Sequence, residues 1–105
     1  MSKLKPVRPG ELLRDEFLVP MGITMNRLAR GIGVSAQRIG RIVSGRGDVN
    51  VDSDLRLCRF FGLSNGYWLR AQAAYDIAVA EEVLAEILAE IKPWDRTGTN
   101  TGSPD

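Results

Sequence analysis

The chain has 105 residues, of which 44% are hydrophobic and 26% charged, the composition of an ordinary globular protein. That length fits one small domain with a modest core. No apolar run approaches the roughly 20 residues that span a bilayer. The polar first ten residues also lack the apolar stretch of a secretory signal, so we expect a cytoplasmic protein.

The side chains that are available exclude most kinds of catalytic and metal site. The chain has no His, and Cys58 is its single Cys, so neither a disulfide, a structural zinc site nor a Cys–His nucleophile can be assembled within it. It also has no phosphate-binding loop and no Ser beside a plausible base. Acidic pairs such as Glu81 and Glu82 have no ligating partner types near them in the sequence. We expect a protein that is not an enzyme and carries no cofactor or metal.

Charge is distributed unevenly along the chain, although the net charge is only +1. Residues 24–47 contain five Arg and no acid, whereas residues 71–91 contain five acids and no base. A local basic patch attracts phosphate even when the net charge is low. On charge alone, solvated helix faces remain the simpler explanation.

The apolar spacing is helical almost throughout, and strand-like alternation is scarce. We predict an all-α domain of five helices over residues 9–92, with an N-terminal arm at 1–8 and a disordered tail at 93–105. From residue 95 on, the tail is rich in Thr, Gly, Ser, Asn and Pro, which is typical of disorder.

Proline, glycine and capping residues divide this domain into its helices. Pro9 suits the start of the first helix, and Pro20 and Gly22 are expected to stop it. The later starts fall at good capping residues and the later ends at glycine or proline. The predicted starts are Thr24, Ser35, either Asn50 or Asp52, and either Ser64 or Asn65; the predicted ends are Gly33, Gly62 and Pro93, with a loop at Gly45 and Gly47. The last segment is long enough to reach Ile91 with a break in its middle.

The second and third predicted helices meet at residues 31–35, whose sequence is Gly-Ile-Gly-Val-Ser. A short turn containing Gly between two amphipathic helices is the helix-turn-helix arrangement. Ala29 is small where the third helix must cross closely, and Gly33 supplies the positive φ that is cheap only for Gly. Val34, Ile39 and Ile42 are expected to fix the third helix against the first two, and Leu28 and Ile32 to complete the buried face of the second.

The outward face of the third helix carries side chains suited to reading DNA. Gln37 and Arg41 are four residues apart and so share a face, and Arg38 is adjacent to both. Gln pairs with adenine and Arg with guanine in the major groove. We predict that these three residues contact bases. The predicted phosphate contacts are Thr24 and Ser35, at the two helix starts, and Arg46 in the following loop.

The last predicted helix carries an apolar stripe with a spacing of three or four residues. This C-terminal stripe consists of Ile77, Ala80, Leu84, Ile87 and Ile91, flanked by Val83 and Leu88. One face of a small domain seldom needs so many apolar residues. Two explanations stay open: the stripe packs on the chain's own core, or it forms a dimer seam or a groove for a partner. The seam would use Ile77, Leu84, Ile87, Leu88 and Ile91. Tyr67 and Trp68 are expected to fill the core.

Several motifs carry a resemblance to a known family. They are Pro9-Gly10-Glu11-Leu12-Leu13, Phe17-Leu18-Val19-Pro20-Met21-Gly22, the helix-turn-helix, Arg59-Phe60-Phe61-Gly62, Tyr67-Trp68-Leu69 and Gln72-Ala73-Ala74-Tyr75-Asp76. With these motifs the chain resembles the HigA (VapI-like) antitoxins of the Cro- and lambda-repressor-like class, over roughly residues 8–80. The run from Phe60 through Tyr75 is the most specific part, because helix-turn-helix proteins in general do not require it.

The resemblance implies a five-helix domain with an extended C-terminal helix, a homodimer, and binding to a palindromic operator in the protein's own promoter. It also implies a partner, a small RelE-like toxin that cleaves mRNA and is neutralised by the antitoxin. The sequence leaves open the alternative of a helix-turn-helix transcriptional regulator with no toxin partner.

Overall fold

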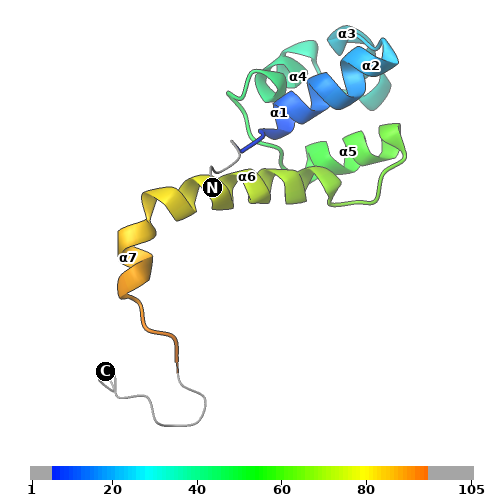
Figure 1. The fold of residues 1–105 in the computed structure, drawn as a ribbon. Helices are drawn as coiled ribbons and strands as arrows, with labels where there is room; N and C mark the ends of the chain where they lie inside the picture. Colours follow the sequence, from blue (N-terminus) through cyan, green and yellow to red (C-terminus); the bar gives the residue numbers. More distant parts are fainter. Residues whose placement is uncertain (1–5, 95–105) are drawn as a thin grey trace.

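The structure, a computed structural model, describes residues 6–94, and all of its regular elements in that range are helices (Figure 1). In chain order they are α1 (Pro9–Leu12), η1 (Leu13–Leu18), α2 (Val19–Met21), α3 (Met25–Ile32), α4 (Ala36–Val43), α5 (Val51–Phe61), α6 (Tyr67–Val83) and α7 (Ala85–Glu90). The first three are one continuous helix, so the described part of the chain holds six helices and the predicted all-α class is confirmed. None of them is both long enough and apolar enough to cross a membrane. Most of the predicted arm and tail lies outside the described residues.

The first helix passes through Pro20, where the sequence predicted a stop. Its middle, η1, is π-helical, and the N–H of Val19 accordingly bonds the carbonyl of Arg14, five residues back. Proline has no N–H and its ring clashes with the carbonyl four residues earlier in an α-helix. The wider π turns that precede Pro20 make room for the ring. The helix ends one residue after it, at Met21, where Gly22 adopts a φ of +67°.

A single core lies between the helices. Its largest fully buried side chains include Leu13, Leu28, Ile39, Leu57 and Trp68, so every helix from the first to α6 contributes. Phe17 packs against Phe61 and Trp68, with ring centroids 4.9 and 5.1 Å apart. The expectation that Trp68 fills the core is confirmed, and Tyr67 is half-buried at its edge.

A buried carboxylate fixes the start of α6. Asp54, only 1% exposed, accepts hydrogen bonds from the backbone N–H groups of Gly66 (2.7 Å), Trp68 (2.8 Å) and Leu69 (3.1 Å). The Cys58 thiol donates to the same carboxylate at 3.6 Å. Burial alone would raise the pKa of Asp54, but these donors outweigh it, so the pKa lies below its usual value. Asp54 thus caps α6 from α5, which is why the helix begins at Tyr67.

The first helix crosses α4 in backbone contact. Gly10 is buried, and a Cβ added to it would lie 2.0 Å from the carbonyl oxygen of Ile42 and 2.8 Å from the Cα of Val43. Only glycine permits so close an approach. The start of the chain's first helix therefore sets the position of α4.

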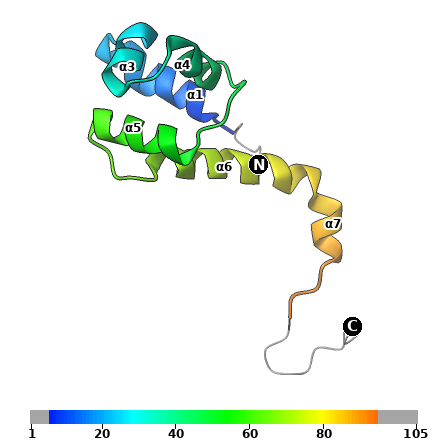
Figure 2. The same cartoon turned by 180° about the vertical axis from the view of Figure 1, so that it is seen from behind.

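The C-terminal helices leave the bundle. The first half of α6 runs beside α5 and α1, whereas its second half and α7 extend away from them in both views (Figures 1 and 2). The break expected in this segment occurs at Leu84, between α6 and α7. Every residue from 79 to 91 is exposed, so the C-terminal stripe does not pack on the chain's own core.

Candidate nucleic-acid interface

The α3–α4 pair has the helix-turn-helix geometry that the sequence predicts. Gly33 ends α3 with a φ of +74°, and α4 begins three residues later. Ala29 is 3% exposed where the two helices cross, and Ile39 and Ile42 hold the inner side of α4. The outer side of α4 is left free for a ligand.

Thr24 and Ser35 both cap their helices. The Thr24 hydroxyl oxygen accepts from the N–H of Arg27 at 3.0 Å, and the Ser35 oxygen accepts from the N–H of Arg38 at 3.1 Å. Both residues are exposed. Each hydroxyl keeps its own proton to donate, and helix N-termini attract anions. The two caps are therefore compatible with the predicted phosphate contacts.

Gln37 and Arg41 lie one turn apart on the exposed side of α4, as predicted. Between them in the sequence is Gly40, where an added Cβ would meet no atom within 4 Å beyond its own stretch of helix, so the space beside it is open. Both side chains line a groove between α4 and the loop that follows it. The groove is lined by Ser35, Gln37, Arg38, Arg41, Ile42, Gly47, Asp48, Asn50 and Ser53.

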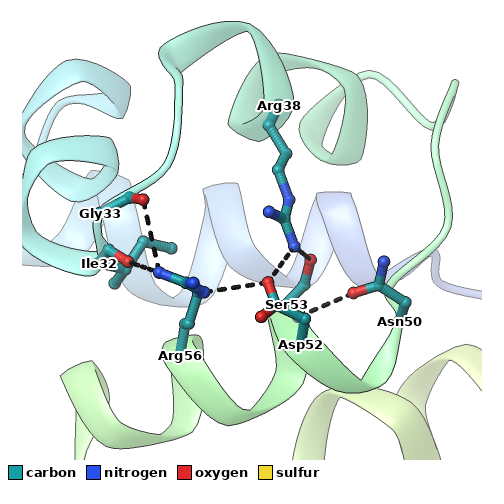
Figure 3. A network of polar contacts seen from close by, with 7 residues as sticks. All are labelled: Ile32, Gly33, Arg38, Asn50, Asp52, Ser53 and Arg56. Carbon is teal, nitrogen blue, oxygen red and sulfur yellow. Dashed lines mark hydrogen bonds and ion pairs between the residues drawn. The ribbon is translucent and has the colours of Figure 1, made fainter.

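Arg38 does not share the orientation predicted for it. Its Nη2 donates to Asp52 Oδ2 at 2.5 Å and to Ser53 Oγ at 2.9 Å, so its guanidinium lies against α5 (Figure 3). The sequence placed Arg38 on the outward face because it is adjacent to Gln37 and Arg41. Adjacent helix positions differ by about 100°, and that rotation turns Arg38 toward the start of α5.

Sequence reasoning also missed Arg56, which joins α5 to the end of α3. Its Nη1 donates to the carbonyl of Ile32 at 2.7 Å, and its Nε donates to Asp52 at 3.0 Å. The last carbonyls of a helix lack partners within it, so Arg56 acts as a C-terminal cap from another element. The spacing of four between Asp52 and Arg56 was the available signal for this pair.

The loop at 44–50 is held from two sides. The N–H of Arg46 bonds the carbonyl of Arg41 at 2.9 Å, and the N–H of Val49 bonds Gln72 Oε1 on α6 at 3.2 Å. Val49 itself is 5% exposed and belongs to the core. Arg46 is exposed on this anchored loop, where a phosphate contact is sterically possible. Gln72 is another residue whose role the sequence did not reveal.

Comparison with known proteins places the chain among helix-turn-helix proteins. The family described as "Helix-turn-helix" matches residues 14–68. The chain is 41% identical to virulence-associated protein I of Dichelobacter nodosus, covering 77% of this chain and 75% of that protein. It is 33% identical to antitoxin HigA-1 of Vibrio cholerae, covering 88% of this chain and 87% of that one.

A solved structure gives the same result. The chain matches the Pseudomonas aeruginosa antitoxin HigA, solved with the higBA promoter, with a TM-score of 0.78 and 36% identity. That match covers 86% of this chain and 99% of the other. The similarity therefore extends through the helices that follow the helix-turn-helix.

Proposed function

We propose, because the chain belongs to the HigA and VapI family of helix-turn-helix antitoxins, that it binds an operator in its own promoter and represses its own operon. We further propose that it acts in the cytoplasm and neutralises a small RelE-like toxin that cleaves mRNA. The observation that carries the DNA-binding role is the exposure of Gln37 and Arg41 on one face of a helix whose other side is fixed in the core.

In the proposed complex, α4 enters the major groove. Gln37 reads adenine and Arg41 reads guanine, since these pairings are bidentate. Thr24, Ser35 and Arg46 contact phosphates on either side of the groove and set the register of α4. Contacts to phosphate carry no sequence information, so specificity rests on the exposed face of α4.

A homodimer completes the proposed function, because one recognition helix reads only a few base pairs. Within the C-terminal stripe, Ile77, Ile87 and Ile91 are 57%, 59% and 62% exposed. Leu84 and Leu88 are exposed as well, and in the proposed dimer a second copy of the chain buries these five apolar side chains. Two-fold symmetry would then place the two α4 helices about 34 Å apart on an inverted repeat.

The DNA-binding part is tested by titrating the protein against DNA from upstream of its own gene and against scrambled DNA of the same length. At physiological salt we expect the promoter to bind at least about 1,000-fold more tightly, the lower end for specific binders. Equal affinity for the two DNAs would contradict the proposal.

The toxin part needs a separate experiment. A small basic reading frame beside the gene is expressed alone and together with this chain. We expect the product of the neighbouring frame to arrest growth when it is expressed alone. Co-expression with this chain should restore growth, and the two proteins should co-purify. An adjacent gene whose product is harmless or does not bind would favour the alternative, a transcriptional regulator with no toxin.

A further inference from the structure

One carboxylate at the start of α5 binds arginines from two directions (Figure 3). Asp52 Oδ2 accepts from Arg38 Nη2 at 2.5 Å and from Arg56 Nε at 3.0 Å. Arg56 also donates a hydrogen bond to the carbonyl of Ile32 at the end of α3, and Arg38 also donates one to Ser53 Oγ. A continuous set of polar contacts thus joins the end of α3, the start of α5 and Arg38 of α4. Arg38 lies between Gln37 and Arg41 in the sequence.

The chemistry of this carboxylate resembles that of DNA phosphate. A guanidinium binds carboxylate and phosphate oxygens through the same charge-assisted hydrogen bonds. Arg38 follows directly after Gln37 in the sequence, yet the exposed fraction of its side chain is only 36% because Asp52 and Ser53 hold it. Asp52 therefore engages a guanidinium that would otherwise be available to a phosphate.

We propose that Asp52 is a specificity-determining positioning residue, which holds Arg38 against α5 and leaves base reading to Gln37 and Arg41. An additional arginine released to the DNA would bind phosphate in any sequence. It would raise non-specific affinity more than specific affinity and so lower the ratio of the two. This inference rests on the proposed DNA-binding function.

The test compares Asp52→Asn with a matched control. Asp48→Asn removes the same charge four residues earlier, from a side chain that lines the groove beside Arg38, and Asp48 takes part in no ion pair among residues 6–94. Affinities for promoter and scrambled DNA are measured over a range of salt concentrations. Thermal unfolding of each variant is recorded in parallel, so that a loss of fold is recognised.

For Asp52→Asn we expect tighter binding to scrambled DNA and a lower ratio of specific to non-specific affinity. The slope of log affinity against log salt should steepen by about 0.9 per bound protomer beyond any change in Asp48→Asn, as one added phosphate contact predicts. In an Arg38→Gln background, Asp52→Asn should behave like Asp48→Asn, since no arginine remains to be released. Arg38→Gln alone should leave the preferred sequence unchanged.

Two results would overturn the proposal. One is a salt slope that changes equally in Asp52→Asn and Asp48→Asn, or a slope change in Asp52→Asn that is the same with and without Arg38. Either would show that Asp52 acts only through its charge and not by holding Arg38. The other is a changed base preference in Arg38→Gln, which would make Arg38 a reader that Asp52 supports. Failure of the proposed function itself would look different, because the wild-type protein would then bind promoter and scrambled DNA equally.

Discussion

Individual residues divide into those whose roles local chemistry reveals and those whose roles depend on distant partners. Thr24, Ser35 and Asn50 cap helices as their side chains predict. Asp54 and Arg38 are different, because the groups that they join across elements lie 12 to 15 residues away along the chain. No periodicity in the sequence reports such contacts, and they became visible only with the structure.

Replacing Asp54 with Asn should destabilise the protein at neutral pH. The loss of charge weakens three hydrogen bonds to buried or partly buried backbone N–H groups, and we expect a free energy of unfolding lower by about 2 kcal/mol. Since the pKa of Asp54 is lowered in the folded state, its stabilisation is complete above the unfolded pKa of about 4. It is lost as pH falls from there through the folded pKa.

Urea unfolding at several pH values measures this effect, with Asp48→Asn as the exposed control. The difference between wild type and Asp54→Asn should be constant from neutral pH down to about 5 and shrink in more acidic solution. A difference that stays the same down to pH 2 would show that the carboxylate charge is not the cause.

Arg46→Ala should weaken binding to all DNA alike. Because a phosphate contact carries no sequence information, we expect the salt slope to fall by about 0.9 per protomer while the preferred sequence stays the same. Binding curves at four or five salt concentrations, with promoter and scrambled DNA, give both quantities. An altered sequence preference with an unaltered slope would assign Arg46 to base reading instead.

At the scale of elements, the helices that end in glycine were predicted closely and those shaped by packing were not. Gly33 and Gly62 end α3 and α5 with φ of +74° and +70°, as the sequence indicates. Pro20 was expected to stop the first helix, but the π turns before it let the helix continue. The start of α6 also differs from the predicted Ser64 or Asn65, because Asp54 supplies a cap that neither residue provides.

Gly10→Ala tests the contact between the first helix and α4. The added methyl group would meet backbone atoms of Ile42 and Val43, which cannot rotate away as side chains do. We expect a loss of about 1–3 kcal/mol in the free energy of unfolding, the usual effect of overpacking. We also expect weaker operator binding, because α4 has to shift.

Gly40→Ala is the matched control for stability. Its added methyl group meets nothing within 4 Å, so the variant should gain up to about 1 kcal/mol from improved helix propensity. Chemical denaturation of the two variants measures both changes. Equal effects at the two positions would rule out a specific role for the crossing at Gly10.

For the whole molecule, the second half of α6 and all of α7 are the segments whose exposed apolar side chains indicate a binding partner. Replacing Leu84 and Leu88 with Glu removes apolar contact and adds charge to a segment that already carries Glu81, Glu82, Glu86 and Glu90. If the stripe is the proposed dimer seam, the variant should be a folded monomer whose operator affinity is lower by orders of magnitude, since tight binding needs two copies.

Light scattering and circular dichroism on this double variant separate the outcomes. A variant that remains dimeric would place the seam elsewhere. A variant that unfolds would show that the stripe stabilises the domain itself. That result would disagree with the structure, in which these side chains are exposed. Glu substitution at Val19, which is 70% exposed on the first helix, serves as the surface control.

The base preference of the Gln37→Ala and Arg41→Ala variants tests the DNA-reading role most directly. Each variant is titrated against the native promoter, against promoters with single base changes, and against scrambled DNA. We predict that each loses about 1–3 kcal/mol of specific binding and relaxes preference at its own base position, while binding to scrambled DNA changes little. Equal losses on specific and scrambled DNA for both variants would contradict the assignment of this face of α4 as the reading surface.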